Sequence, residues 1–170
     1  MSSAYERELK GILGGDADVI GKAARTFPTS EQTGYRAAVE RPFLVVRGAG
    51  SLGVDLVALR GDVSFPIEVK SASRDVIHFS DASGANHAQA EAMRKECARA
   101  SVIPLYAYRL KGVRGGDPWR VFTLPTEGLP PRLSVLYDRL PKVAVSPGGF
   151  YVLRWSEGLS LSRFLDYLCR

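Results

Sequence analysis

The feature that most constrains the fold is a pair of short apolar segments, residues 54–60 and 65–71, joined by a tight turn. Apolar and polar residues alternate along the second segment, which is typical of a β-strand with one buried face. A Gly-Asp pair at 61–62 supplies the turn, so the two segments are predicted to form a β-hairpin. Because side chains two positions apart in a strand point to the same face, Glu68 and Lys70 lie side by side.

The turn also brings Asp55, near the start of the first segment, back beside Glu68 and Lys70. Carboxylate oxygens are ligands of hard divalent cations, and an amine beside them can stabilise charge on a phosphate. This set of side chains predicts a metal-dependent nuclease. A D-x12-E-x-K pattern by itself also occurs in strands whose charges face water, but here the charged residues are embedded among apolar ones, which favours a site.

Bulk properties limit the class of protein. The chain has 170 residues, of which 45% are hydrophobic, enough for one compact domain. It has no long apolar run and is charged near its start, so we expect no membrane span, no signal peptide and a cytoplasmic location. The net charge of +5 favours a polyanionic partner without separating DNA, RNA and anionic membrane surfaces. The two cysteines have no metal-ligand spacing and are expected to be reduced.

Helical and strand patterns alternate along the rest of the chain and predict an α/β fold, in which a mixed central β-sheet is flanked by helices. The first three strands follow one another and suggest an antiparallel meander. Strands are predicted at residues 43–47, 54–60, 65–71, 104–110, 119–124 and 150–154. Helices are predicted from residue 4, in 14–27, after a Thr-x-x-Gln capping box at 29–32, and at about 87–100, 133–140 and from residue 160 onward.

The first helix carries a third carboxylate. Ser3 can cap this helix, and Glu6 then falls on the same stripe as Leu9 and Leu13. Glu6 is therefore expected to face the sheet. Glu8 lies on the opposite side of the helix, where water is the expected neighbour.

Three stretches of the sequence resemble the archaeal Holliday junction resolvases, a branch of the restriction-endonuclease-like PD-(D/E)XK nucleases. They are ERELK at 6–10, VVRGAGSLGVDLVAL at 45–59 and IEVKS at 67–71. IPLYAYRL and DPWRVFTLP are similar to the later strands of that family. The resemblance implies a restriction-endonuclease-like fold and a homodimer that binds branched DNA. It implies an endonuclease that resolves four-way (Holliday) junctions in recombination and repair, with Mg²⁺ as cofactor and Mn²⁺ able to replace it.

The resemblance also implies roles for individual residues. Glu6 would be the helix-borne carboxylate, Asp55 and Glu68 the principal metal ligands, and Lys70 the catalytic lysine. The carbonyl of Val69 would complete the metal site. Positions next to the scissile DNA strand are matched by Arg7, Arg47 and Ser51.

Simpler interpretations stay open for some of these residues. Arg7 can equally be a solvated helix residue, and Ser51 can merely shape the turn. Gln89 lies in a region where many nucleases of this superfamily place a glutamine that supports the site.

One departure from the family is the long stretch between Glu6 and Asp55. It predicts a single nuclease domain over residues 1–170 with a helical insertion at about 14–42, which could reshape the DNA-binding face. Two other functions therefore stay open. One is a nuclease with the same core that acts on a flap, a mismatch or a duplex site. The other is a non-catalytic junction-binding protein, against which the presence of all four predicted catalytic residues argues.

Overall fold

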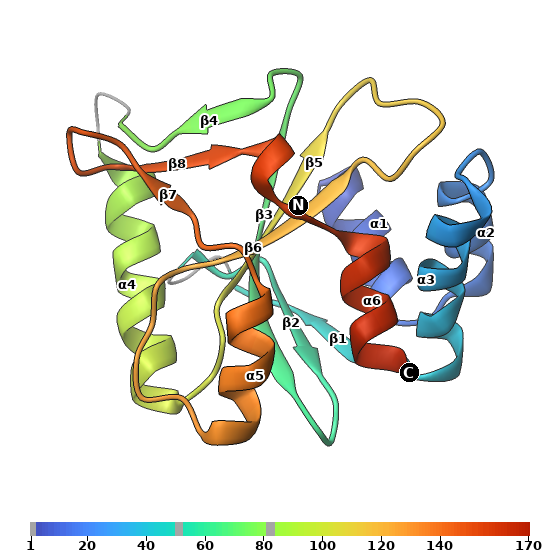
Figure 1. Ribbon diagram of the computed structural model, residues 1–170, viewed down its shortest axis with the longest axis horizontal. Helices are drawn as coiled ribbons and strands as arrows, with labels where there is room; N and C mark the ends of the chain where they lie inside the picture. Colours follow the sequence, from blue (N-terminus) through green and yellow to red (C-terminus); the bar gives the residue numbers. More distant parts are fainter. Residues whose placement is uncertain (1–2, 50–52, 81–83) are drawn as a thin grey trace.

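A computed structural model describes residues 3–49, 53–80 and 84–170 (Figure 1). Its main sheet has the strand order β1-β2-β3-β5-β6-β9, and a smaller sheet has the order β4-β8-β7. The strands are β1 (Leu44–Arg47), β2 (Leu56–Leu59), β3 (Ser64–Ala72), β4 (Val76–His78), β5 (Leu105–Leu110), β6 (Trp119–Thr123), β7 (Ala144–Val145), β8 (Tyr151–Arg154) and β9 (Leu159–Ser160). The helices are α1 (Ala4–Leu13), α2 (Ala17–Ala23), α3 (Thr29–Glu40), α4 (Ala85–Ala100), α5 (Pro131–Arg139) and α6 (Leu161–Cys169).

The main sheet is mixed, as predicted. β1, β2 and β3 form an antiparallel meander, and β3 then pairs in parallel with β5. A parallel neighbour requires a crossover, which α4 supplies in the chain between β3 and β5. β6 and β9 continue the sheet in antiparallel fashion. The expected α/β architecture, a mixed central sheet flanked by helices, is therefore confirmed.

The two faces of the main sheet have separate apolar cores. One core joins α1, α2, α3 and α6 to alternate side chains of the sheet such as Phe65 and Ile67. The other joins α4 and β8 to the opposite side chains, including Tyr106 and Tyr108. Figure 1 shows α4 on one side of the sheet and α1, α2, α3 and α6 on the far side. This alternation places Glu68 and Lys70 on the face that α4 covers.

The segment 14–42 is part of the main body of the protein. α3 packs along α6, and Tyr35 and Ala38 of α3 are completely buried. The hydroxyl of Tyr35 donates a 2.7 Å hydrogen bond to Oδ1 of Asp117. A Cβ atom on Gly34 would lie 2.1 Å from the carbonyl oxygen of Ser162, so only glycine allows this close helix contact. That the segment is an insertion relative to the resolvase family stays a prediction, but in this chain it supplies core residues.

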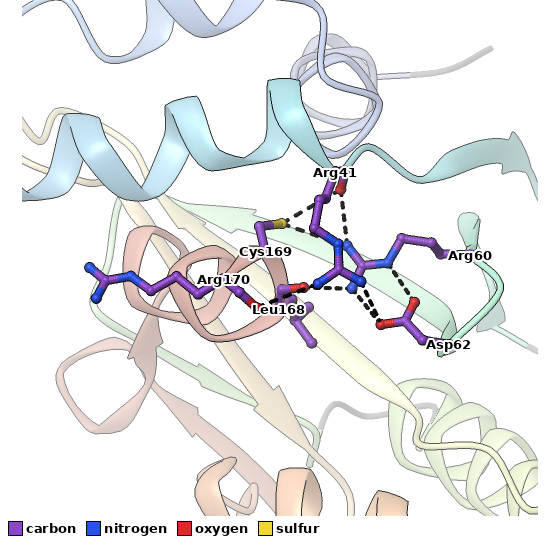
Figure 2. A network of polar contacts seen from close by, with 6 residues as sticks. All are labelled: Arg41, Arg60, Asp62, Leu168, Cys169 and Arg170. Carbon is purple, nitrogen blue, oxygen red and sulfur yellow. Dashed lines mark hydrogen bonds and ion pairs between the residues drawn. The ribbon is translucent and has the colours of Figure 1, made fainter.

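The C-terminal helix is tied to the β2–β3 turn by Arg60 (Figure 2). The guanidinium donates to both carboxylate oxygens of Asp62, at 2.6 and 2.9 Å. It also donates to the carbonyl oxygens of Arg41, at 2.9 Å, and Leu168, at 2.6 Å. One side chain thus joins the end of α3, the end of α6 and the hairpin turn. These contacts hold the hairpin that carries Asp55 against the helical layer.

Two local predictions were wrong or incomplete. Thr29 does not cap α3, because it already lies inside the helix, and Pro28 occupies the cap position without a side-chain hydrogen bond. Gln32 instead donates to the carbonyl of Phe27 at 2.8 Å. Strands β4, β7 and β9 were not predicted, since segments of two or three residues carry no measurable alternation. None of the helices within the described ranges is long and apolar enough to cross a membrane.

Candidate active site

Asp55 is fixed beside the third strand by two hydrogen bonds. Its backbone N–H donates to the carbonyl oxygen of Ile67 at 2.9 Å, and its Oδ2 atom accepts from the backbone N–H of Val69 at 2.8 Å. The carboxylate therefore lies next to the strand that carries Glu68 and Lys70. This is the arrangement that the hairpin pattern predicted.

Glu68 and Lys70 form an ion pair on one face of β3. The Nζ atom of Lys70 lies 3.0 Å from Oε1 of Glu68, and the Glu68 residue is only 6% exposed. Burial raises the pKa of Glu68 to about 7, against the opposing effect of the Lys70 charge and with a smaller contribution from the nearby carboxylate of Asp55. The charges of Lys70 and Asp55 therefore both influence the ionisation of Glu68.

The second carboxylate oxygen of Glu68 is the clearest sign of a missing partner. Oε2 of Glu68 is buried and has no hydrogen-bond partner in the part of the chain that the structure describes. A buried carboxylate oxygen is costly unless it is protonated, hydrogen-bonded or bound to a cation. Asp55 lies close by, and oxygen donors of this kind are those that Mg²⁺ and Mn²⁺ prefer. The donor set therefore fits a divalent cation.

Glu6 does not join this cluster. It lies half-buried in the first turn of α1, which packs on the sheet face opposite Glu68 and Lys70. The ring of its neighbour Tyr5 lies under the guanidinium of Arg109, which pairs with Ser71 of β3. Glu6 is thus near the end of the sheet where β3 finishes, but no hydrogen bond or ion pair among the described residues connects it to the other carboxylates. Nor do these residues contain a group of three or more His, Cys, Asp or Glu side chains arranged to hold a metal ion.

The expectation that Glu8 faces water was wrong. Its Oε1 atom accepts a 3.0 Å hydrogen bond from Nε of Arg109 and a 2.8 Å hydrogen bond from Nε1 of Trp119. β5 and β6 pass beneath this side of α1, which the helical periodicity of α1 alone could not show. Glu8 therefore anchors the helix to the sheet.

The three residues expected near DNA lie in different situations. Arg7 is exposed on α1. Arg47 is exposed at the end of β1, where it pairs with Leu56, directly after Asp55. Ser51 lies outside the described residues. The position of Arg47 next to the Asp55 segment is suitable for contact with a DNA strand bound at the site.

The resemblance pointed to Gln89 of α4 as a residue near the site, but the sequence did not reveal Asn86. Oδ1 of Asn86, in the first turn of α4, accepts a 3.3 Å hydrogen bond from Nζ of Lys70. Gln89 packs against Gly53, where φ is +69° and an added Cβ atom would lie 2.4 Å from Cγ of Gln89. The start of α4 thus touches both Lys70 and the segment that leads into Asp55. The three-residue spacing of Asn86 and Gln89, which places both on one helix face, is the signal in the sequence that could have added Asn86 to Gln89.

Comparison with known proteins gives a match at the level of structure alone. Neither a protein-family model nor a curated protein sequence matches the chain. Among solved structures, the chain is similar to Hjc of Archaeoglobus fulgidus, a Holliday junction resolvase from an archaeal hyperthermophile. The TM-score is 0.51 at 15% sequence identity, and the match covers 99% of this chain and 100% of Hjc. The chain therefore has the restriction-endonuclease-like α/β fold of the Holliday junction resolvase Hjc.

Proposed function

We propose that this protein is a divalent-metal-dependent endonuclease that resolves four-way DNA junctions in recombination and repair. The observation that carries the proposal is the cluster of Asp55, Glu68 and Lys70, with an unpartnered buried oxygen on Glu68, in a chain with the fold of Hjc. Buried polar atoms without a hydrogen-bond partner are few in folded proteins, and a carboxylate oxygen in that state suits a bound cation.

Asp55, Glu68 and the carbonyl of Val69 would hold Mg²⁺ or Mn²⁺. When bound, the cation would lower the pKa of a water molecule and offset negative charge on the phosphate. Glu6, which lies outside this cluster, would contribute through a bridging water molecule. The direct ligands would then be the two carboxylates of the cluster and one carbonyl oxygen.

Lys70 would act on the phosphate itself. Glu68 and Asn86 both accept hydrogen bonds from its Nζ atom, so the ammonium group is held in one position. From there it would donate to a non-bridging oxygen of the scissile phosphate or orient the attacking water. A preorganised donor of this kind stabilises charge that develops in the transition state.

Substrate choice would depend on shape rather than on base sequence. The net charge of +5 suits a phosphate-rich partner, and contacts to phosphates carry no sequence information. Arg7, Arg47 and Ser51 would contact the strand next to the site. A two-fold symmetric homodimer would place two such sites on opposed strands of a junction, which gives paired cuts.

The test is cleavage of a synthetic four-way junction with Mg²⁺, with Mn²⁺ and with a chelator. We expect paired symmetric nicks that require the metal, and a Glu68→Ala variant that binds the junction without cutting it. Glu96→Ala is the matched control, because Glu96 is an exposed carboxylate on the outer side of α4. Binding of the junction without cleavage by the unaltered protein would contradict the proposal. A flap, a mismatched duplex and a linear duplex in the same assay test the alternative that another DNA structure is the substrate.

A further inference from the structure

A groove of about 520 Å³ opens beyond the ends of β3 and β5, where the chain turns into β4. Its lining includes Arg74, Asp75 and His78 from the β3–β4 connection and Lys111 from the loop after β5. The groove is distinct from the cluster of Asp55, Glu68 and Lys70. It lies at the C-terminal end of β3, the strand that carries Lys70.

The lining of this groove is held by contacts to the chain on both sides. The carbonyl oxygen of Arg74 accepts a hydrogen bond from the hydroxyl of Tyr108, and the carbonyl oxygen of Asp75 accepts one from the backbone N–H of Trp155 at 2.8 Å. The backbone N–H of Lys111 donates to the carbonyl oxygen of Ala72, the last residue of β3, at 2.8 Å. The backbone on both sides of the groove is therefore held by hydrogen bonds to neighbouring segments.

The cations in the groove have no carboxylate partner among the residues that the structure describes. Arg74 and Lys111 are exposed, and neither forms an ion pair within the described ranges. The Nζ atom of Lys111 lies 5.8 Å from the centroid of the Tyr5 ring. Other exposed cations, such as Arg132 and Arg163, also form no ion pair among the described residues, so what sets Arg74 and Lys111 apart is that both line one groove. Asp75 is the single acidic side chain in the described lining, so the groove has a net positive charge.

The groove is also at a suitable distance from the candidate active site. Arg74 follows Lys70 by four residues, which spans at most about 13 Å of extended chain at roughly 3.3 Å per residue. DNA advances about 3.4 Å along its axis per phosphate of one strand. A strand with its scissile phosphate at Lys70 would therefore reach the groove within about four nucleotides.

We propose that this groove binds the sugar–phosphate backbone of DNA a few nucleotides from the cut, through Arg74 and Lys111. The inference rests on the proposed function for the location of the cut, but the groove itself is a DNA-binding surface whether or not cleavage occurs. The contacts are to phosphates, so binding is independent of base sequence.

The test is the salt dependence of DNA binding, measured with a fluorescent four-way junction and with a linear duplex in the presence of a chelator. Each phosphate contact contributes about 0.9 to the slope of log K against log salt. We expect the double variant Arg74→Ala/Lys111→Ala to reduce the slope by about 2. Arg74→Lys/Lys111→Arg keeps both charges and is expected to keep the slope.

The matched control is Arg132→Ala/Arg163→Ala, which removes the same charge from exposed positions on α5 and α6 that do not line the groove. An equal slope change in the control, or no change in the groove variant, would overturn the inference while junction cleavage by the unaltered protein still stands. A reduced slope in the groove variant alone supports it, even if no substrate in the panel is cut.

Discussion

The Oδ2 atom of Asp55 accepts a hydrogen bond from the backbone N–H of Val69 at 2.8 Å, so a side chain at the start of one strand holds the main chain of the next. The same carboxylate lies beside Glu68 and contributes to the raised pKa of that residue. Asp55 therefore has two separable roles. Its oxygen accepts a hydrogen bond that fixes the hairpin, and its negative charge suits a cation.

Two substitutions of Asp55 are expected to separate these properties. Asp55→Asn keeps an oxygen acceptor for Val69 and loses the charge, so we expect near-normal stability and a cleavage rate lowered by at least about 100-fold. Asp55→Ala loses both and leaves a backbone N–H unsatisfied, which costs roughly 1–3 kcal/mol. Urea denaturation and junction cleavage measure the two effects. Equal stability of the two variants would contradict the structural role.

The raised pKa of Glu68 predicts a pH dependence of stability in metal-free protein. Because the folded state binds this proton more tightly than the unfolded state, the contribution of Glu68 is fully present below pH 4.5 and is lost as the pH rises to about 7. The loss is roughly 3 kcal/mol, at 1.36 kcal/mol per pKa unit. Denaturation at several pH values with a chelator measures it.

Glu68→Gln is the control for this pH effect, since the amide cannot titrate. The difference in stability between the unaltered protein and the variant should therefore change between pH 4.5 and 8. Addition of Mg²⁺ at pH 8 should raise the stability of the unaltered protein more than that of the variant. If the stability of the two proteins changes with pH in the same way, burial does not raise the pKa of Glu68.

Asn86 is expected to position Lys70. Asn86→Ala removes one of the two acceptors of the ammonium group, so we expect cleavage to fall by about 10- to 100-fold while junction affinity is unchanged. Asn86→Asp retains an acceptor and should recover part of the rate. Single-turnover cleavage at saturating protein gives the rate, and binding in a chelator gives the affinity. A matched loss of affinity would instead indicate a general role in folding or DNA contact.

Tyr35 is expected to stabilise the protein through its hydroxyl. Tyr35→Phe leaves the ring in the core and removes the hydrogen bond to the buried carboxylate of Asp117, at a cost of about 1–2 kcal/mol. Tyr167→Phe is the control, because Tyr167 is 44% exposed. Thermal or urea unfolding measures both. If the two variants are equally stable, the hydrogen bond between Tyr35 and Asp117 contributes nothing to the stability of the protein.

Arg60 is expected to hold the C-terminal helix through its planar guanidinium. Lysine cannot reproduce the simultaneous contacts to Asp62, Arg41 and Leu168, so Arg60→Lys should cost roughly 1–3 kcal/mol. Faster hydrogen exchange along α6 should accompany the loss. Arg99→Lys is the control, because the side chain of Arg99 is 77% exposed in its ion pair with Glu96. This variant should change stability by less than about 0.5 kcal/mol. Unchanged exchange in α6 would contradict the clamp.

Local patterns predicted the hairpin and the main elements well. The shared face of Glu68 and Lys70 follows from the period of two in any strand, and the turn at Gly61 determines that Asp55 returns beside them. The fold class, predicted from the alternation of helices and strands and from the resemblance to the resolvases, is confirmed by the match to Hjc. The assignment of catalytic roles stays a prediction.

Helical periodicity alone gave a wrong environment for Glu8 and no role for Asn86. Periodicity shows which side of an amphipathic helix is apolar, but which strands pass beneath the helix depends on the whole chain. Glu8 meets Arg109 and Trp119, more than 100 positions away. Asn86 meets Lys70 only because α4 crosses the sheet to connect parallel strands.

The sequence by itself determined the hairpin, the pairing of Asp55 with Glu68 and Lys70, and the alternation of elements, because these depend on covalent geometry and on contacts between near neighbours in the chain. Only the tertiary structure decided that Glu6 lies apart from that cluster, that Asn86 of α4 contacts Lys70 and that Arg74 and Lys111 line one groove. These relationships join segments distant in sequence, and they arise when apolar faces on both sides of the sheet are buried together.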